Sequence, residues 1–504
     1  MSLIRKSVCL LFAVLIILGV LASCTGEEKP GDTTDPADTG SQADTTASLP
    51  EESTLPKVED NLPESLKFEG EKVNILAPKI KKGGIVDLYT DELNSDPIND
   101  SIYNRELYVE DRLGVKVEFP QFSGTYLDEI QKQANSGDET YQLYYVVSHE
   151  MADYVFDGYY LDLSDIDYFD FDMPWWNGDF IKECSVKNKV FMLTGSLSLT
   201  MLREIHAVYF NKTLATDYGA GITELNDLYG LVDSGKWTID KLMELSGEIY
   251  RDLNGDQIRD IEDCYGVICV GPTADMPWGA FDISVFEKDE DDWFVFNVNT
   301  DKLFAAYEKI YDLYYNTAGS ATAYFEVSGS DAANMFADGN ALFLLDSLND
   351  VEKTSFRNMK DDYGILPEPK YNEQQKEYYA YSGEFSCFAI PITNSRPEVT
   401  AAVLEAMSSY SYNETVPAYL DLALKGRYMS DAQSRKMIDL TIKNVKIDAA
   451  WTYLEEIGAG YAPSFRYRIW DKENSFASNH QTYSQKVKRA MIGFADKYRK
   501  AFGD

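Results

Sequence analysis

Val73-Asn74-Ile75-Leu76-Ala77-Pro78 opens the folded part of this 504-residue chain, and its dense apolar character predicts a buried strand. Residues 96–113 carry apolar side chains at helical spacing, whereas residues 115–119 alternate apolar and polar side chains like a strand. Residues 126–134 predict a second helix, and residues 142–147 predict the next strand. Because strands alternate with helices here, we expect an α/β fold with a mostly parallel sheet covered on both faces.

The same mixture continues through the rest of the chain. Residues 190–193, 207–210 and 341–345 are strand-like apolar runs. Ser395-Arg396-Pro397-Glu398 has the pattern of a capping box that begins a helix. Apolar side chains at helical spacing between Val487 and Tyr498 predict a terminal helix.

The first residues have the pattern of an export signal. Arg5 and Lys6 precede an apolar run from Val8 to Leu21, and Ala22-Ser23-Cys24 follows it. Leu21-Ala22-Ser23-Cys24 resembles the bacterial lipobox, in which a diacylglycerol is attached to the cysteine and the chain is cut before it. We therefore expect a signal peptide over residues 1–23 and a lipidated Cys24; the alternative is an ordinary signal peptide with an incidental cysteine. The expected location is the extracellular face of a bacterial cell membrane, with a lipid anchor.

Composition limits what this chain can do. Residues 24–65 are rich in Thr, Asp, Glu, Ser, Pro and Gly and poor in large apolar residues, so they predict a flexible tether. The remainder is long enough for two or three domains with their own cores. The formal net charge is −38, which argues against nucleic acid and anionic membrane surfaces as partners.

Cysteines do not predict a bridged fold or a metal site. Beyond the signal segment and Cys24, the chain has Cys184, Cys264, Cys269 and Cys387, and no pair has metal-ligand spacing. So few cysteines in a long exported chain indicate that core burial stabilises the fold. We expect buried free thiols, with one disulfide as the alternative.

Several stretches, in their order and spacing, resemble one known family. They are Phe210-Asn211-Lys212, Ser234-Gly235-Lys236-Trp237-Thr238, Asp252-Leu253-Asn254-Gly255-Asp256, the segment 335–343 and the segment 363–370. Residues 66–504 resemble the extracellular solute-binding protein family 1, the oligosaccharide-type lipoproteins of bacterial ABC importers. The segment from Phe336 to Leu342 looks like that family's helix-to-strand corner.

The resemblance implies a fold and a set of partners. It implies two α/β lobes that are joined by three hinge crossings and close on a ligand. The implied partners are a carbohydrate or other small solute and the membrane subunits of an ABC permease, and we expect a monomer. The crossings would fall near Ile205–Asn211, Asp362–Pro367 and Tyr410–Val416, with one lobe at 66–207 plus 366–412 and the other at 208–365 plus 413–504.

An acidic loop predicts a structural calcium site. Calcium binds six to eight oxygen ligands, and a tight loop can supply them from alternating residues. Gln257 occupies the position at which such loops usually have a glycine. The last ligand is one of two adjacent acids, Glu262 or Asp263. The predicted ligands are Asp252, Asn254, Asp256, the backbone carbonyl of Ile258, Asp260, and Glu262 or Asp263. The alternative is an acidic turn that holds no ion.

Candidate ligand-binding residues are aromatic or acidic, because sugars stack on aromatic rings and hydrogen-bond to carboxylates. His149 and Glu150 follow a predicted strand, and ligands of open α/β sheets lie beyond the carboxyl ends of strands. By analogy of position with the family, Trp278 and Asp346 are candidates too. The remaining candidates are Trp175, Trp176, Tyr381 and Glu384. The alternative for the three tryptophans is packing in the core. The alternative for Tyr381 and Glu384 is a place at a strand edge, and that for His149 is a structural role.

Enzymatic activity is not expected. The sequence lacks Gly-x-Ser-x-Gly, His-Glu-x-x-His and a phosphate-binding glycine loop. A glycosidase would need two carboxyl groups about 5–10 Å apart, and the many acidic residues leave this alternative open. A surface adhesin or a sensor's co-receptor is a third possibility.

Overall fold

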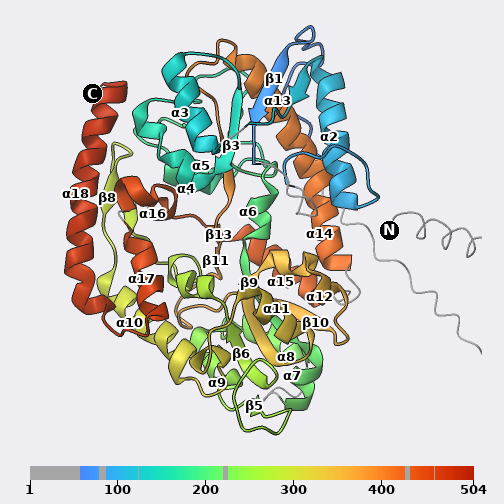
Figure 1. Ribbon diagram of the computed structural model, residues 1–504, viewed down its shortest axis with the longest axis vertical. Coiled ribbons are helices and arrows are strands. Elements are labelled where there is room, and N and C mark those ends of the chain that lie inside the picture. Colours follow the sequence, from blue (N-terminus) through green and yellow to red (C-terminus); the bar gives the residue numbers. More distant parts are fainter. Residues whose placement is uncertain are drawn as a thin grey trace, which may run out of the picture. The chain divides into compact units, whose positions relative to one another are not determined.

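The computed structural model describes residues 57–78, 87–122, 124–218, 225–425, 432–458 and 460–503. Residues Lys57–Asp504 form one compact unit that contains two main sheets (Figure 1). The predicted signal peptide, Cys24 and residues 25–56 of the predicted tether lie outside the described residues. Within the described ranges, no helix has the length and apolar character needed to cross a membrane.

The small sheet has four strands in the order β12-β3-β1-β2. Strand β1 runs parallel to β2 and β3, and β12 runs antiparallel to β3. The strands are β1 (Lys72–Leu76), β2 (Lys116–Glu118), β3 (Leu143–Val147) and β12 (Ser386–Ala389), and the helices nearby are α2 (Pro97–Leu113), α3 (Tyr126–Ser136) and α13 (Pro397–Tyr410). The strands and helices predicted between residues 73 and 147 are confirmed.

Two helices of this region begin in different ways. The side chain of Asp96 caps α2 by accepting hydrogen bonds from the amides of Ile98 and Asn99. The capping box predicted for α13 is wrong, because its N-cap residue is Arg396, which makes no side-chain cap. Ser395 instead donates its hydroxyl to Glu139, at 2.8 Å. Pro397, whose φ is already suited to a first helical turn, still begins the helix.

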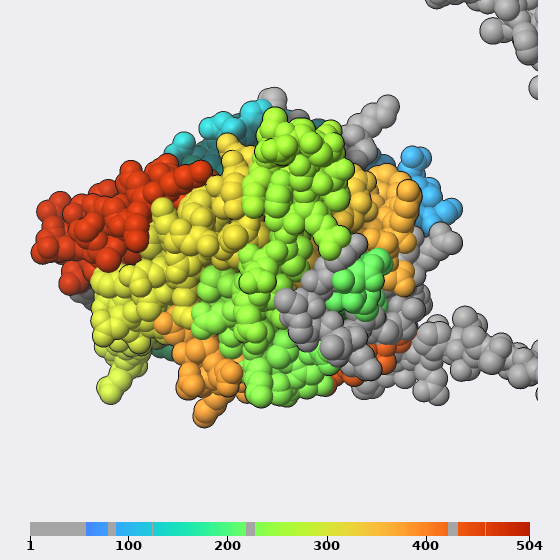
Figure 2. Space-filling view, turned by 90° about the horizontal axis from the view of Figure 1, so that it is seen from below, coloured from blue at the N-terminus to red at the C-terminus, as the bar shows by residue number. Residues whose placement is uncertain are grey.

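The large sheet has five strands in the order β10-β4-β9-β6-β5. Strands β6 and β9 are parallel, and β4 is antiparallel to both of its neighbours. Figure 2 shows that the face seen from below carries mostly green and yellow residues, which come from the middle of the chain. The strands are β4 (His206–Asn211), β5 (Tyr250–Arg251), β6 (Cys264–Cys269), β9 (Ala341–Ser347) and β10 (Tyr363–Pro367).

The strand predicted at 190–193 does not form. Leu193 makes one isolated bridge with Phe388, which belongs to the edge strand β12 of the small sheet. The apolar character of this run serves core packing, since Phe191 and Leu193 are both buried. A continuous apolar run without alternation does not by itself distinguish a strand from a buried loop.

The chain passes between the two sheets three times. Helix α6 (Leu199–Arg203) leads into β4, and residues 368–385 lead from β10 back to β12. Helix α13 continues through the π-helical turn η6 (Ser411–Thr415) into α14 (Val416–Lys425), and α15 (Ala432–Lys443) then packs on β10. The segments predicted as crossings contain β4, β10 and η6, and the division into two lobes remains a prediction.

The predicted terminal helix is present as α18 (Phe476–Phe502). Phe494 in this helix packs on Phe156, with ring centroids 4.1 Å apart. The remaining elements lie around the two sheets. They are α4 (Ser148–Ala152), η1 (Val155–Asp157), α5 (Gly178–Cys184), α7 (Lys212–Tyr218), α8 (Leu225–Asp233), α9 (Ile239–Ser246), η2 (Gly271–Trp278), β7 (Phe286–Lys288), β8 (Phe294–Phe296), α10 (Thr300–Tyr311), η3 (Asp312–Asn316), η4 (Ala321–Ala323), α11 (Gly329–Ala337), η5 (Leu348–Glu352), α12 (Thr354–Arg357), β11 (Ala380–Tyr381), β13 (Val445–Lys446), α16 (Ala449–Thr452), η7 (Leu454–Gly458) and α17 (Tyr461–Trp470).

Two sequence expectations concern the boundary and the core. Packed residues begin before the predicted boundary at residue 66, because Leu62 is buried and the amide of Val58 donates to Asn413 at 2.9 Å. The expectation of buried free thiols is confirmed: the four described cysteines, Cys184, Cys264, Cys269 and Cys387, are unpaired and buried.

Candidate functional site

A pocket of about 520 Å³ lies where the ends of the two sheets meet. Residues from both sheets and from the connecting segments line it. They are Ser148, His149, Glu204, His206, Pro272, Asp346, Ser347, Tyr381, Gly383, Glu384, Trp451, Leu454, Pro463, Arg466 and Tyr467.

The sheet topology explains why these residues meet. His149 follows the carboxyl end of β3 in the small sheet, and Asp346 lies at the carboxyl end of β9 in the large sheet. His206 lies at the amino end of β4, which reaches the same edge because β4 runs antiparallel to β9 and pairs His206 with Ser347. Ligands of α/β folds bind at the carboxyl ends of strands, and both sheets direct such ends toward this one pocket.

Aromatic rings form one side of the pocket and extend beyond it. Tyr381 packs against Trp451, with ring centroids 5.7 Å apart. Tyr467 on α17 lines the pocket, and Trp470 one helical turn later packs on it at 5.6 Å. Tyr467 is 50% exposed and Trp470 is 44% exposed, so both rings leave apolar surface open to a ligand.

Arg466 is held between these rings by a buried acid. Its Nη1 donates to Oδ2 of Asp275 at 2.6 Å, and its guanidinium lies 5.4 Å from the Trp451 ring and 5.7 Å from the Tyr467 ring. Asp275 is fully buried, and burial raises its pKa to about 7 against the opposing effect of Arg466. The charge of Arg466 is thus already paired within the protein.

Three carboxylates from three segments face the pocket: Glu204 after α6, Asp346 in β9, and Glu384 between β11 and β12. Oε1 of Glu204 accepts a hydrogen bond from the side chain of Asn349 at 3.1 Å. Burial raises the pKa of Glu204, and the charges of Asp346 and Glu384 raise it further. Asp346 and Glu384 therefore both repel the carboxylate of Glu204.

His206 forms a buried polar wall of the pocket. Its side chain is enclosed at 4% exposure and meets the Tyr381 ring edge-on at 5.3 Å. Burial, assisted by the charge of Arg466, lowers the pKa of His206 to about 4, so the ring is neutral at pH 7. A neutral imidazole offers one hydrogen-bond donor and one acceptor.

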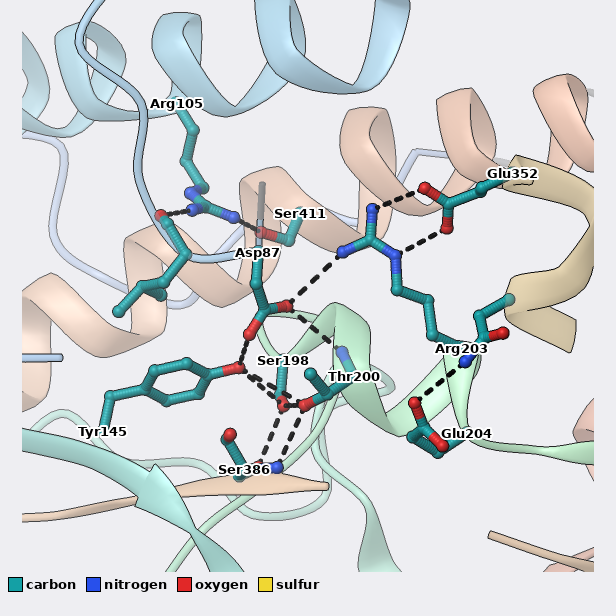
Figure 3. A network of polar contacts seen from close by, with 12 residues as sticks. Asp87, Arg105, Tyr145, Ser198, Thr200, Arg203, Glu204, Glu352, Ser386 and Ser411 are labelled. Atoms are coloured by element: carbon teal, nitrogen blue, oxygen red, sulfur yellow. Dashed lines mark hydrogen bonds and ion pairs between the residues drawn. The ribbon is translucent and has the colours of Figure 1, made fainter. Parts of the chain in front are cut away.

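A polar network beside the pocket connects the two sheets (Figure 3). Arg203 in α6 donates to Glu352 through Nε at 2.7 Å and Nη2 at 3.2 Å. Its Nη1 also lies 3.8 Å from Asp87, which accepts from the hydroxyl of Tyr145 in β3. Since Glu352 follows β9 and Tyr145 belongs to the small sheet, Arg203 joins both sheets next to Glu204.

The structure brings together half of the predicted ligand-binding residues. His149, Asp346, Tyr381 and Glu384 line the pocket. Glu150, which follows His149 in the chain, does not line it. The other three predicted residues, Trp175, Trp176 and Trp278, are buried outside it.

The buried tryptophans have structural partners instead. Trp175 and Trp176 both donate their Nε1 to Glu405, at 2.6 and 3.1 Å. Trp278 packs edge-on against Tyr461 and Phe465. The prediction that these rings form an open platform is corrected for this conformation, because a large aromatic ring is as often used to fill a core.

Sequence reasoning missed five charged or aromatic residues of the lining. Glu204 directly follows α6 and His206 begins β4 two residues later, and no local pattern marks either as a pocket residue. Trp451, Arg466 and Tyr467 lie in short helices, and their sequence carries no motif that indicates a pocket. The exposure of neighbouring aromatic residues in α17 is a signal that only the structure provides.

The predicted calcium loop does not present a metal site as it is folded. Among the described residues, no group of three or more His, Cys, Asp or Glu side chains lies close enough to hold a metal ion. The acidic side chains of the loop accept hydrogen bonds from the loop's own backbone. Asp252 accepts from the amides of Gly255 and Gln257, Asp256 accepts from the amide of Ile258, and Asp260 accepts from the amide of Glu262. The buried Asp263 accepts from the amide of Leu253 and the hydroxyl of Tyr250, and the side chain of Asn254 donates to Glu262. The predicted ligand set also includes Asn254 and the Ile258 carbonyl, and calcium at this loop remains a prediction.

Comparison with known proteins identifies the fold. No family model and no curated protein matches the sequence. The structure matches 595 chains of solved structures, so the fold is common and does not by itself specify a ligand. One of them is the crystal structure of a cyclo/maltodextrin-binding protein complexed with maltotetraose, with a TM-score of 0.51, 10% identity, and coverage of 87% of this chain and 100% of that chain. The chain has the α/β fold of solute-binding proteins, as predicted.

Proposed function

We propose that this chain is a lipid-anchored extracellular receptor that binds a carbohydrate in the pocket between its two sheets and delivers it to an ABC permease. The observation that carries this proposal is the pocket at the strand ends of both sheets, with Trp451 and Tyr467 beside buried polar groups. Aromatic faces suit the apolar faces of sugar rings, and carboxylates and imidazoles suit the hydroxyls. The likeness in fold to a protein solved with maltotetraose agrees with this ligand class.

The proposed mechanism is closure of one sheet region on the other. A ligand that contacts both His149 beside the small sheet and Asp346 in the large sheet favours the closed arrangement. Such a ligand shifts the population toward the closed form by its differential affinity. The permease then recognises the closed form. Delivery to a permease and attachment through Cys24 extend the proposal from the sequence resemblance.

Binding is tested by calorimetry with a panel of oligosaccharides, on the chain from residue 25 onward. Tyr467→Ala should weaken binding about 2- to 10-fold, the amount expected for the loss of one stacked ring. Tyr324→Ala is the matched control, because Tyr324 is a similarly exposed tyrosine on the large-sheet side that does not line the pocket. Equal affinities of the two variants would refute the assignment of the pocket.

Two further measurements address the other parts of the proposal. Sustained hydrolysis of any bound oligosaccharide would favour the glycosidase alternative. Cys24→Ala should release the full chain from the membrane fraction, and co-purification with permease subunits should separate a transport receptor from an adhesin.

A further inference from the structure

The charge of the pocket is unbalanced. Glu204, Asp346 and Glu384 form no ion pair among the described residues, and no lysine lines the pocket. The one lining cation, Arg466, is paired with the fully buried Asp275. The lining of the pocket therefore holds more carboxylates than cations, and the nearest outside cations, Arg203 for Glu204 and Lys353 for Asp346, act from beyond the lining.

The surroundings of the pocket strengthen this excess. Burial raises the pKa of Asp153 to about 6, and the charges of Glu456, Glu455 and Glu150 contribute to this rise. Burial also raises the pKa of Tyr126, and Glu150 and then Glu384 add to that shift. Glu150 and Glu455 directly follow the lining residues His149 and Leu454 in the chain, so further acids lie near the pocket.

His206 supplies an independent indication of a ligand. It is more than nine-tenths buried, forms part of the pocket wall, and has no hydrogen-bond partner among the described residues. The ring nitrogens of His206 are not among the buried atoms that lack a partner, so they can be reached from the pocket. A neutral imidazole can accept a hydrogen bond from an ammonium or a hydroxyl group.

We propose that the pocket selects carbohydrates that carry protonated amino groups, such as oligomers of glucosamine, over their neutral counterparts. This inference rests on the proposed function and names its substrate class. An ammonium group placed among Glu204, Asp346 and Glu384 would be attracted by all three, and attraction between charges near a protein surface is several times stronger than in bulk water. The aromatic rings of Trp451 and Tyr467 would still contact the sugar faces, and can also attract a cation.

The test compares two tetramers that differ in charge: one of glucosamine and one of N-acetylglucosamine, in which acetylation removes the positive charge. Calorimetry at low salt should give at least about 10-fold tighter binding of the glucosamine tetramer, and this preference should shrink as salt is raised. Glu384→Gln should lower the preference at least about 3-fold. Glu384 is exposed, so this variant is expected to fold.

Asp346→Asn provides a second test from the other sheet and should lower the preference in the same direction. Glu244→Gln is the matched control, because Glu244 is an exposed acid outside the pocket and its loss should leave the preference unchanged. A preference that survives Glu384→Gln and Asp346→Asn would overturn the inference.

The outcomes separate this inference from the proposed function. Equal or tighter binding of the N-acetylated tetramer would overturn the inference and support the carbohydrate receptor. Binding of neither tetramer would overturn both. Tighter binding of spermidine, a polyamine without sugar rings, would also overturn both, because it would assign the negative pocket to a different class of cation.

Discussion

Glu352→Gln tests the connection between the two sheets. Arg203 and Glu352 are nearly enclosed, with 5% and 8% of their side chains exposed, and they form two hydrogen bonds of 2.7 and 3.2 Å. The variant keeps one oxygen acceptor but removes the negative charge and turns an amide N–H toward the guanidinium. The remaining acid, Asp87, lies 3.8 Å from Arg203. The guanidinium would then remain buried without its nearest negative charge.

The expected magnitude follows from burial. Breaking a buried ion pair by removing one partner costs about 3 kcal/mol or more. The entropy of unfolding is about 2.1 cal/mol/K per residue, which gives roughly 1 kcal/mol/K for a unit of about 450 residues. Glu352→Gln should therefore lower the Tm by about 3 °C and shift the urea midpoint to a lower concentration.

Glu244→Gln is the matched control for this experiment too. Lys241 and Glu244 form an ion pair in which 66% of the Glu244 side chain is exposed. Exposed pairs contribute little, so the control should lower the Tm by less than about 1 °C. A Glu352→Gln shift no larger than that of the control would refute the view that Arg203 stabilises the junction between the sheets.

Three other predictions concern separate regions. Trp175→Phe removes the donor to Glu405, so it should lower the free energy of unfolding by about 2 kcal/mol in denaturant titrations and leave sugar affinity within about 2-fold in calorimetry. Burial raises the pKa of Glu368 from 4.5 to about 8, so the stability that its protonated form contributes is present below about pH 4.5 and is lost as the pH rises through 8. Glu368→Gln keeps the oxygen that accepts a hydrogen bond from the amide of Tyr381. This variant should therefore show a smaller fall of Tm between pH 4.5 and about pH 8. The calcium prediction expects that calcium raises the Tm and that Asp256→Asn reduces the rise, whereas a Tm that calcium leaves unchanged would mean that the loop remains a hydrogen-bonded turn.

Local structure was largely predictable from local sequence. Helix α2 formed where Asp96 precedes a periodic apolar run and Gly114 ends it, because a cap and a left-handed glycine act within a few residues. The first strand formed at 72–76 for a similar reason. Ser395 shows the limit: its sequence suits a cap, but Glu139, more than 250 residues away in the chain, takes its hydroxyl.

The sequence by itself determined the α/β class, the buried free thiols and the places where strands end, which is why His149 could be predicted, whereas Asp346 was predicted from the family resemblance. Only the tertiary structure decided that Glu204, His206 and Arg466 meet in one pocket, and that Trp175 and Trp176 instead face Glu405. The physical reason is that helices and strands form from hydrogen bonds and apolar periodicity within short segments. A pocket forms where segments far apart in the chain converge, and its charge depends on which acids find a cation in three dimensions.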